Sequence, residues 1–462
     1  MRFSGLDQSG RIVRERAWRP PAEIFAGLSR QRFPVWLDSN GPIGPRSRFS
    51  FLCIDPSEVV EQRGGWLRRN GVGLQGRGFD ALAAMVADWR RPMLPGPAPF
   101  MGGAVGLLGY DLGRELETLP TRHRADPDLP SLWFGLYDLV LAFDRLERRS
   151  WLISTGLHPL RSAAERADWF EDVIDATGSP DLAPVPPLVF RPDQAPDAYR
   201  QMVRRGLELI EAGDIFQANL TMRHVAERPP GLDPAAVYLA LREGSPAAFG
   251  AFIGWEGGRA VASASPERFV LLDREGVVET RPVKGTIRRQ PDPSSDAVAI
   301  RTLAASVKDR AENLMIVDLM RNDLARVCET GSVSVPALFE IDSIATLHHL
   351  VSTVSARLRP GEDAVSLLRA SFPGGSITGA PKIRAMEIID ALEASARGPY
   401  CGSVAWIGHD GAMDSSILIR SLFLTTSLVF AHAGGGIVAD SDPDAEHAEM
   451  LAKLASVLGP FR

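Results

Sequence analysis

The sequence contains little cysteine. Only Cys53, Cys328 and Cys401 occur in 462 residues, and they stand far apart. This spacing excludes a CxxC zinc site and a dense disulfide framework. We therefore expect each cysteine to be a small buried hydrophobic residue in a reducing cytoplasm.

The sequence also lacks a long apolar run and an excess of positive charge. No apolar stretch reaches the roughly eighteen residues that a membrane-spanning helix needs, and the charged N-terminus has no apolar core of a secretory signal. The 51 basic and 57 acidic residues leave a net charge of -6, which is a poor basis for nucleic-acid binding. These absences predict a cytoplasmic protein that binds neither membranes nor nucleic acids.

The composition that remains is typical of a globular protein, with 45% hydrophobic and 23% charged residues. Short apolar runs at residues 131–145 and 150–155 predict strands in the N-terminal part. Later in the chain, helical stretches alternate irregularly with strand-like runs. This order indicates mixed α/β layers and not a regular doubly wound sheet.

A proline-rich segment at residues 177–197, "TGSPDLAPVPPLVFRPDQAPD", has neither a helical nor a strand period. We interpret it as a crossing. It connects an N-terminal region, residues 1–176, to a C-terminal region, residues 198–460.

Several helices in the C-terminal region bear on function. One is predicted over residues 197–212, ending before Gly213, and a long one over residues 295–327. Another begins near Pro381, a residue favoured at the first helical position, and a last one follows Pro443. In the helix near Pro381, one face is expected to carry Ile383, Met386, Ile389 and Leu392.

Carboxylates on two of these helices are candidate metal ligands. Glu446 and Glu449 are three residues apart and share a helix face, and Glu312 lies on the earlier helix. Carboxylates brought together from two helices suit Mg²⁺, which takes a few oxygen ligands and keeps some of its water. The alternative is a solvated acidic face, and the isolated E-x-x-E pair by itself favours that alternative.

Two glycine-rich stretches are candidate binding surfaces. Residues 372–381, "FPGGSITGAP", run into a helix N-terminus, where backbone N–H groups can hold a phosphate or a carboxylate. The stretch is not a Walker loop, and a simple tight turn explains it equally well. Residues 433–440, "AGGGIVAD", would let a planar ligand approach the backbone closely.

Lys284 stands in "RPVKGTIRRQ", shortly after Glu267 in "ASPERF". To act as a nucleophile the lysine must be neutral, which requires a pKa lowered by burial or by nearby positive charge. A buried, protonated Glu267 could act as a general acid toward a poor leaving group. The alternatives for Lys284 are a surface lysine, an ion-pair partner or an anion clamp.

Two strand-like stretches carry further polar candidates. Arg420 in "SSILIRSLFL" points either outward, the default, or inward toward an anion that it would hold with two hydrogen bonds. His348 and His349 are neighbours in a strand pattern, so one must face each way.

Together these segments resemble one family, the chorismate-utilising enzymes. The matching blocks occur in the family's order: "GDIFQANL" (213–220), "SPERF" (265–269), "PVKGT" (282–286), "DRAENLMIVDLMRNDLARV" (309–327), "HLVSTV" (349–354), "FPGGSITGAPKIRAMEII" (372–389), "YCGSVAWI" (400–407) and "GGGIVADSDPDAEHAEM" (434–450). The blocks "SRFSFLCIDP" (47–56) and "GGAVGLLGYDLGRELE" (102–117) extend the resemblance into the N-terminal region.

The resemblance implies a fold and a set of site residues. The fold is mixed α/β, with two antiparallel β-sheets forming a sandwich wrapped by helices. Glu312 and Glu446 match Mg²⁺ ligands, with Glu449 acting through water, and the metal would hold the ring carboxylate of chorismate. Arg420 matches the residue that grips the enolpyruvyl carboxylate, and His349 lies beside the ring. The substrate site would also be lined by Thr378, Gly435, Gly436, Lys453 and Gln217.

Two positions discriminate the reactions within this family. Lysine at position 284 matches the branch that aminates chorismate at C4, and glutamine at position 217 matches relatives that use ammonia and not water. Lys284 would attack C2 while Glu267 protonates the departing C4 hydroxyl, and ammonia would then give 4-amino-4-deoxychorismate for 4-aminobenzoate and folate synthesis. None of the cysteine segments resembles a glutaminase nucleophile elbow, so the resemblance implies a separate glutamine amidotransferase subunit in a heterodimer.

The alternatives are an anthranilate-forming relative that carries lysine, and a non-catalytic chorismate-binding protein. Some relatives bind tryptophan nearby, where the segment "WLDS" (36–39) matches only loosely, and this question stays open.

Overall fold

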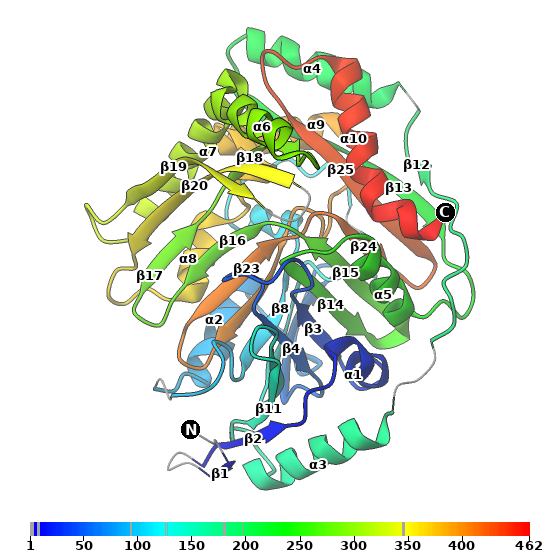
Figure 1. Cartoon of the computed structure of the whole chain (residues 1–462), viewed down its shortest axis with the longest axis vertical. Helices are drawn as coiled ribbons and strands as arrows, with labels where there is room; N and C mark the ends of the chain where they lie inside the picture. Colours follow the sequence, from blue (N-terminus) through cyan, green and yellow to red (C-terminus); the bar gives the residue numbers. More distant parts are fainter. Residues whose placement is uncertain are drawn as a thin grey trace.

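The computed structural model describes residues 4–6, 10–92, 95–124, 126, 128–178, 182–195, 197–343 and 347–462. Its strands form two large β-sheets that pack face to face, and helices lie around them (Figure 1). Within the described residues, neighbouring strands pair antiparallel, for example β14 with β15 and β8 with β9. The predicted sandwich of two antiparallel sheets is therefore confirmed.

The first sheet contains strands from both ends of the chain. In spatial order these are β1 (Ser4–Leu6), β2 (Ile12–Arg16), β11 (Arg149–Ser154), β10 (Leu139–Asp144), β4 (Phe49–Cys53), β3 (Val35–Asp38), β14 (Phe249–Trp255), β15 (Arg259–Ser265), β24 (Ser421–Leu424), β25 (Leu428–Ile437), β13 (Gln217–Glu227) and β12 (Arg191–Pro192), and the short β21 (Gly379–Ala380) also pairs with β13.

The second sheet is built in the same mixed way. In spatial order its strands are β18 (Val283–Arg288), β20 (Leu347–Arg357), β17 (Val277–Thr280), β16 (Arg268–Leu272), β23 (Met413–Ile417), β22 (Ser403–Gly408), β8 (Gly103–Leu108), β9 (Leu132–Tyr137), β5 (Glu58–Arg63), β6 (Trp66–Arg69) and β7 (Val72–Leu74), and β19 (Ser334–Ser343) pairs with β20.

The helices cover the outer faces of the sandwich, with α10 and α4 at one end and α3 at the other (Figure 1). Their bounds are α1 (Pro21–Leu28), α2 (Gly78–Asp88), α3 (Ala163–Ala176), α4 (Ala198–Glu211), α5 (Pro234–Gly244), α6 (Pro293–Ala305), α7 (Val307–Ala325), α8 (Ala364–Ser371), α9 (Lys382–Leu392) and α10 (Pro443–Leu458), with 3₁₀ turns at η1 (Tyr110–Glu115), η2 (Glu256–Gly258), η3 (Gly375–Ile377) and η4 (Gly459–Phe461).

Apolar side chains fill the space between the two sheets. Phe51 and Val261 from the first sheet belong to the same buried cluster as Phe134 and Val270 from the second. A second cluster joins the other face of the first sheet to the helices that cover it, with Phe25 of α1 among its members. Burial of this apolar surface is the main force that holds the layers together.

Strands from both sides of the proline-rich segment lie in each sheet. β3 pairs with β14 in the first sheet, and β8 pairs with β22 in the second. Residues 179–181 and 196 of the segment lie outside the described residues. The division into regions 1–176 and 198–460 stays a prediction, but the two regions share their sheets.

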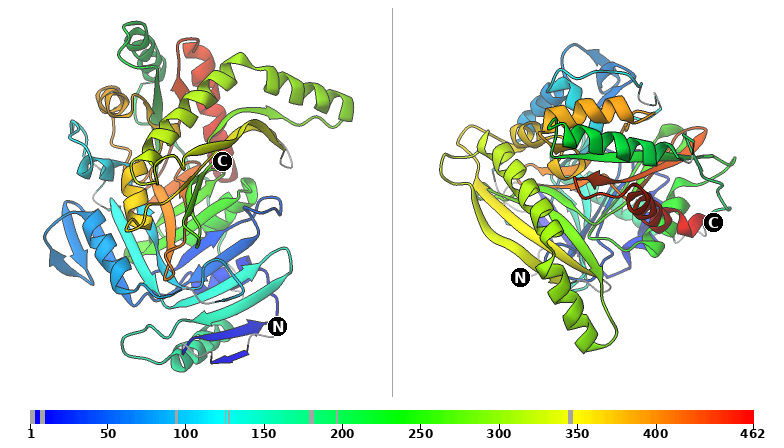
Figure 2. Two further views of the ribbon diagram at one scale, coloured as in Figure 1. Left: turned by 90° about the vertical axis from the view of Figure 1, so that its left-hand side faces the viewer. Right: turned by 90° about the horizontal axis from the view of Figure 1, so that it is seen from above.

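The predicted helices near residues 197 and 443 are present as α4 and α10, and Gly213 after α4 has the left-handed φ of 82°. The single long helix predicted over residues 295–327 is wrong. The chain leaves the helical conformation at Ser306, which has ψ 110° and caps α7 by accepting a hydrogen bond from the Asp309 N–H. Figure 2 shows α6 and α7 as separate helices along the strands of the second sheet.

The helix predicted to begin near Pro381 is present as α9, which begins at Lys382 with Pro381 as its N-cap. Met386 and Ile389 are buried as predicted, whereas Ile383 in the first turn is 45% exposed.

The three cysteines are buried and unpaired, as expected. Among the helices of the described residues, none combines the length and the apolar character required to cross a bilayer.

Candidate active site

The two glycine-rich stretches of the sequence lie beside one end of the first sheet. β13 and β25 lie side by side, with Asn219 opposite Gly436. On its other edge β13 pairs with β21, so that Gln217 lies opposite Ala380 of the glycine-rich loop, residues 372–381. The two glycine-rich stretches therefore flank the same strand.

Lys284 lies at an irregular point of β18. The pairing register with β20 shifts between Val283 and Thr286, and Gly285 has φ 83°, a conformation that glycine adopts without strain. A bulge of this kind turns a side chain away from the regular alternation of a strand. A Cβ atom placed on Gly436 would lie 3.3 Å from Lys284 Nζ, so the amine reaches the glycine face of β25.

The surroundings of Lys284 lower the pKa of its amine. Burial is the largest cause that lowers its pKa, and the charge of Lys453 lowers it further. Glu312, Glu267 and Glu449 act in the opposite direction, but the pKa stays below the ordinary lysine value. A lysine with a lowered pKa can act as a nucleophile near neutral pH.

Glu267 follows β15 at the turn into β16, and the pKa of its carboxyl group is shifted in the opposite direction. Burial raises its pKa above the ordinary value, although a hydrogen bond from Ser376 and the charges of Lys284, Arg420 and Lys453 lower it. Ser376 Oγ donates to Glu267 Oε1 at 2.8 Å. A carboxyl group that keeps its proton can act as a general acid.

Ser376 was not singled out from the sequence. It stands inside the glycine-rich loop, but Glu267, which accepts its hydrogen bond, lies 109 residues earlier in the chain. A serine within a candidate binding loop was the signal that could have identified it.

The three candidate metal ligands come from α7 and α10. Burial raises the pKa of Glu312, Lys284 and Lys308 lower it, and Asp309 and Glu446 raise it further. The carboxylates of Glu312 and Glu446 therefore interact across the site. Glu446 is 7% exposed and accepts a 2.7 Å hydrogen bond from Ser441 Oγ.

Glu449 lies one helical turn from Glu446 and pairs with Lys453. Lys453 Nζ is 2.7 Å from Glu449 Oε1 and donates to the Gly434 carbonyl at 2.9 Å. Burial raises the pKa of Glu449, but Lys453 outweighs this and leaves the pKa below its ordinary value. Among the described residues, no three His, Cys, Asp or Glu side chains are grouped closely enough to hold a metal ion.

The glycines of β25 make room for these side chains. A Cβ atom on Gly435 would lie 2.9 Å from Glu446 Oε2 and 3.9 Å from Lys453 Nζ, and one on Gly436 would lie 2.8 Å from Gln217 Nε2. A side chain at either position would fill the space in front of Lys284 and Glu446.

Gln217 and Thr378 form the wall between β13 and the glycine-rich loop, and both are fully buried. The Thr378 carbonyl accepts the Asn219 N–H at 2.8 Å, while Thr378 Oγ1 donates to the Gly374 carbonyl at 3.0 Å. Among the described residues, neither amide atom of Gln217 has a hydrogen-bond partner. A buried amide without a partner is costly, so this group fits a site where a ligand completes its hydrogen bonds.

Arg420 does not lie in a strand, so that prediction is wrong. It occupies the turn between β23 and β24 with the left-handed φ of 50°. Its carbonyl accepts the Ala264 N–H at 3.1 Å, which explains how the turn is held against β15. Burial lowers the pKa of Arg420 and Glu267 raises it, so the guanidinium lies toward the site.

The two histidines of β20 face opposite ways, as predicted. His348 is buried between Ser343 Oγ at 2.7 Å and Asp296 at 2.9 Å. His349 Nδ1 contacts Thr286 Oγ1 at 2.8 Å, two residues after Lys284. Of the pair, His349 is thus the one on the side of the candidate site.

A separate cavity of about 400 Å³ lies between the halves of the sandwich. Leu37, Asp38 and Ser39 of the "WLDS" segment line it together with Arg268 and Asp414. The family resemblance leaves open whether tryptophan binds in this region.

Comparison with known proteins gives the family. The model of chorismate binding enzymes matches residues 40–459. Aminodeoxychorismate synthase component 1 of Escherichia coli (strain K12) is 44% identical over 454 residues, which cover 96% of each chain. The protein of the same name from Klebsiella aerogenes is 42% identical over 449 residues, covering 96% of this chain and 97% of that protein.

A solved structure agrees with this result. Anthranilate synthase component I from Streptococcus pneumoniae TIGR4 superposes with a TM-score of 0.80 at 31% identity and covers 90% of this chain and 93% of its own. The family resemblance of the motifs is confirmed: the chain belongs to the chorismate binding enzymes.

Proposed function

We propose that this chain aminates chorismate at C4 and forms 4-amino-4-deoxychorismate. One observation carries the proposal: a lysine with a lowered pKa, Lys284, faces the glycine surface of β25 beside the buried amide of Gln217. Two relatives that match nearly end to end carry the name aminodeoxychorismate synthase component 1, which supports the same reaction.

In the first step, the neutral Lys284 amine attacks C2 of the ring as the bond from C4 to its hydroxyl oxygen breaks. The two ring double bonds, C1=C2 and C5=C6, shift to C1=C6 and C4=C5, and Glu267 gives its proton to the hydroxyl, which leaves as water. The lysine nitrogen then carries a positive charge in the adduct, and Glu267 is left as a carboxylate. The raised pKa of Glu267 and the lowered pKa of Lys284 provide the acid and the nucleophile that this step needs.

In the second step, ammonia attacks C4, both double bonds shift back and Lys284 leaves C2 as the neutral amine. The nitrogen now bound to C4 gives one proton to the Glu267 carboxylate, so chorismate and ammonia are converted into the amino product and water and the enzyme groups are restored. Two displacements with a covalent adduct replace one difficult substitution at C4. This transfer of an amino group is the transaminase-class activity that we assign.

We assign Mg²⁺ to the carboxylates of Glu312 and Glu446, although the described residues do not form a ready-made cluster of metal ligands. Burial is the main cause that raises the pKa of Glu312, and the charge of Glu446 raises it further; a divalent cation would offset the repulsion between the two carboxylates. Glu312 and Glu446 would hold the ion directly and Glu449 through water. When bound, Mg²⁺ would supply positive charge that orients the ring carboxylate.

The remaining side chains would bind and orient chorismate. Arg420 would hold the enolpyruvyl carboxylate with two hydrogen bonds, and His349 would lie beside the ring. Thr378, Gly435 and Gly436 would form the surface against which the ring packs, and Lys453 would add positive charge.

Ammonia would come from a separate glutamine amidotransferase subunit in a heterodimer. The relatives are named as a component 1, which supports a second component. The buried, unpaired cysteines fit a reducing compartment, and we assign the reaction to the cytoplasm.

The competing function is the formation of anthranilate, because a solved structure that matches this chain is an anthranilate synthase component I. Incubation of the purified chain with chorismate, Mg²⁺ and ammonium at alkaline pH separates the two. The proposal predicts a non-fluorescent amino product with the ring substituted at C4, identified by mass and NMR. Fluorescent anthranilate as the product would overturn it.

A further inference from the structure

Along part of one edge of β13, side chains take the place of a neighbouring strand. β25 pairs along the full length of the other edge, from Ala218 to Glu227. On the edge in question, β21 pairs only with Gln217 and Ala218, and β12 only with His224 and Val225. Between these two short strands, the Asn219 carbonyl and the Thr221 N–H bond to a buried ion pair.

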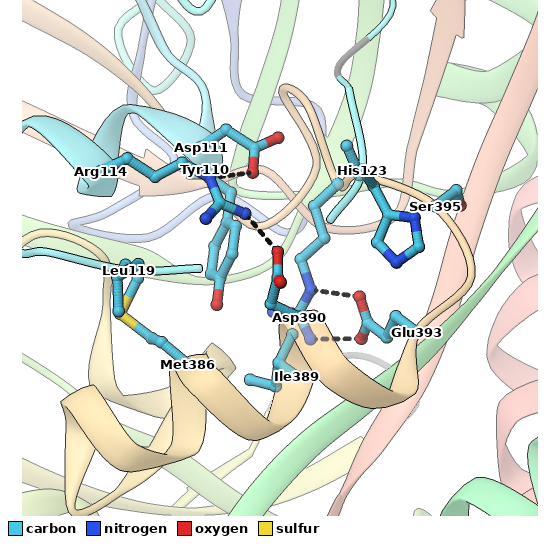
Figure 3. A pocket seen from close by; sticks show the side chains of 12 residues that line it. Tyr110, Asp111, Arg114, Leu119, His123, Met386, Ile389, Asp390, Glu393 and Ser395 are labelled. Atoms are coloured by element: carbon cyan, nitrogen blue, oxygen red, sulfur yellow. Dashed lines mark hydrogen bonds and ion pairs between the residues drawn. The ribbon is translucent and has the colours of Figure 1, made fainter. Parts of the chain in front are cut away.

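That ion pair joins Arg397 to Glu393. Arg397 Nε and Nη2 donate to the two oxygens of Glu393 at 3.0 and 2.6 Å, and the pair is shown with the residues around it in Figure 3. Glu393 Oε1 also accepts from the backbone N–H and the hydroxyl of Thr221, each at 2.9 Å. The carboxylate thus takes the place of a strand partner.

The guanidinium of Arg397 extends the same edge toward the site. Its Nη2 donates to the Asn219 carbonyl at 2.5 Å and its Nη1 to the Ile377 carbonyl at 2.8 Å. Asn219 lies opposite Gly436, and Ile377 immediately precedes Thr378 in the glycine-rich loop. One side chain therefore ties the strand of Gln217 to the loop of Thr378.

The pair is deeply buried. Arg397 is 2% exposed, Glu393 is 6% exposed, and the guanidinium lies 4.5 Å from the centre of the Tyr110 ring. Buried ion pairs are weak sources of stability, because the cost of removing two charges from water cancels much of their attraction. Their clearest physical effect is to fix geometry, since both partners are satisfied in only one arrangement.

We propose that Arg397 and Glu393 are positioning residues for the amination of chorismate. They do not touch the reacting atoms. They hold Asn219 and Ile377 so that Gln217, Gly436 and Thr378 stand at the distances from Lys284 that the reaction needs. The proposal rests on the proposed function of this site.

A neighbouring pair on the same helix provides the control. Asp390 of α9 accepts from Arg114 Nη2 at 2.6 Å (Figure 3). Its other oxygen accepts from the Arg122 N–H at 3.3 Å. Asp390 is 7% exposed, like Glu393, but its hydrogen bonds run to residues 114 and 122 and not to β13 or the loop. Asp390→Asn therefore perturbs a neighbouring ion pair with a buried carboxylate and a partly exposed arginine, without touching the site backbone.

The test compares Arg397→Lys with Asp390→Asn. Lysine keeps the charge but cannot bond Glu393 and two carbonyls together. We expect Arg397→Lys to lower kcat/KM for chorismate by about 30-fold or more at saturating ammonium, while its Tm stays within a few degrees of that of Asp390→Asn. Asp390→Asn should keep kcat/KM within about threefold of the unmodified chain. Equal kinetics for the two variants would overturn the proposal.

A second measurement covers the case in which Arg397→Lys does not fold. In Glu393→Gln, hydrogen–deuterium exchange should be faster than in the unmodified chain at residues 219–221 and 375–380, and unchanged there in Asp390→Asn. Unchanged exchange in Glu393→Gln would contradict the positioning role. The kinetic assay follows the loss of chorismate and the exchange assay follows the backbone, so neither depends on which product forms. If the unmodified chain makes anthranilate, the proposed function is rejected, but this comparison of variants still holds.

Discussion

Ser376 Oγ donates a 2.8 Å hydrogen bond to Glu267 Oε1, and this contact connects the glycine-rich loop to the general acid of the proposed reaction. Lys284, Arg420 and Lys453 are the cations that also act on Glu267, and all of them lower its pKa. Burial outweighs these four influences, so the pKa of Glu267 stays above its ordinary value. The pKa of Glu267 thus depends on opposing influences, and a single substitution can change it.

Ser376→Ala tests that balance. The hydrogen bond stabilises the carboxylate, so its removal should raise the pKa of Glu267 further and move the alkaline limb of the kcat profile to higher pH. The loss of orientation should lower kcat by about tenfold at neutral pH. Ser371→Ala, which changes a nearby hydroxyl without a protein partner among the described residues, should leave the profile in place. An unmoved alkaline limb in Ser376→Ala would show that this contact does not tune the acid.

Glu446→Gln tests the metal site. Loss of one direct carboxylate ligand should raise the Mg²⁺ concentration for half-maximal chorismate consumption by at least about tenfold. Glu449→Gln should raise it less, because that residue is expected to act through water. Calorimetric titration with Mg²⁺ gives the affinity without turnover. Glu387→Gln, which alters a half-buried carboxylate paired with Arg384, is the matched control, and an equal effect in all three variants would reject the assignment.

His409 makes the fold sensitive to acid. Burial lowers the pKa of its imidazole to about 4, against 6.5 in the unfolded chain, so the unfolded chain binds a proton first as the pH falls. The stabilisation from the neutral ring is complete above pH 6.5 and is lost between pH 6.5 and about 4. Between pH 7 and 5 the loss amounts to about 2 kcal/mol.

His409→Phe keeps a ring that can stack on Trp89, as the imidazole does with a centroid distance of 6.1 Å. Its Tm should therefore fall less between pH 7 and pH 5 than that of the unmodified chain. Thermal melts at the two pH values measure this difference, and parallel falls in Tm would show that His409 does not titrate as proposed.

The sequence predicts the local parts of this site well. Lys284 and Glu267 stand beside proline and glycine residues whose turn preferences are visible in the chain, and Glu446 and Glu449 follow from the period of one helix. The break at Ser306 was missed because residues on both sides have helical periodicity, and a serine cap competes with the helix only through its local hydrogen bond. Arg420 was placed in a strand because alternating apolar residues hide a single left-handed residue.

The long-range contacts could not be predicted from one sequence. Arg397 contacts Asn219 across 178 residues, and Glu393 contacts Thr221 across 172. On a single sequence, Arg397 and Glu393 are ordinary charged residues after a helix. Only the fold shows that they replace a missing strand beside the candidate site.

The central claim is that Lys284 forms a covalent bond to the substrate. Intact-protein mass spectrometry of the chain, incubated with chorismate and Mg²⁺ without ammonia, tests it most directly, with Lys284→Arg as the control that keeps the charge but removes the nucleophile. The account predicts an added mass equal to chorismate minus one water, located on Lys284, formed faster as rising pH neutralises the amine and absent from Lys284→Arg. An unmodified Lys284 in a chain that converts chorismate when ammonium is added would contradict the account.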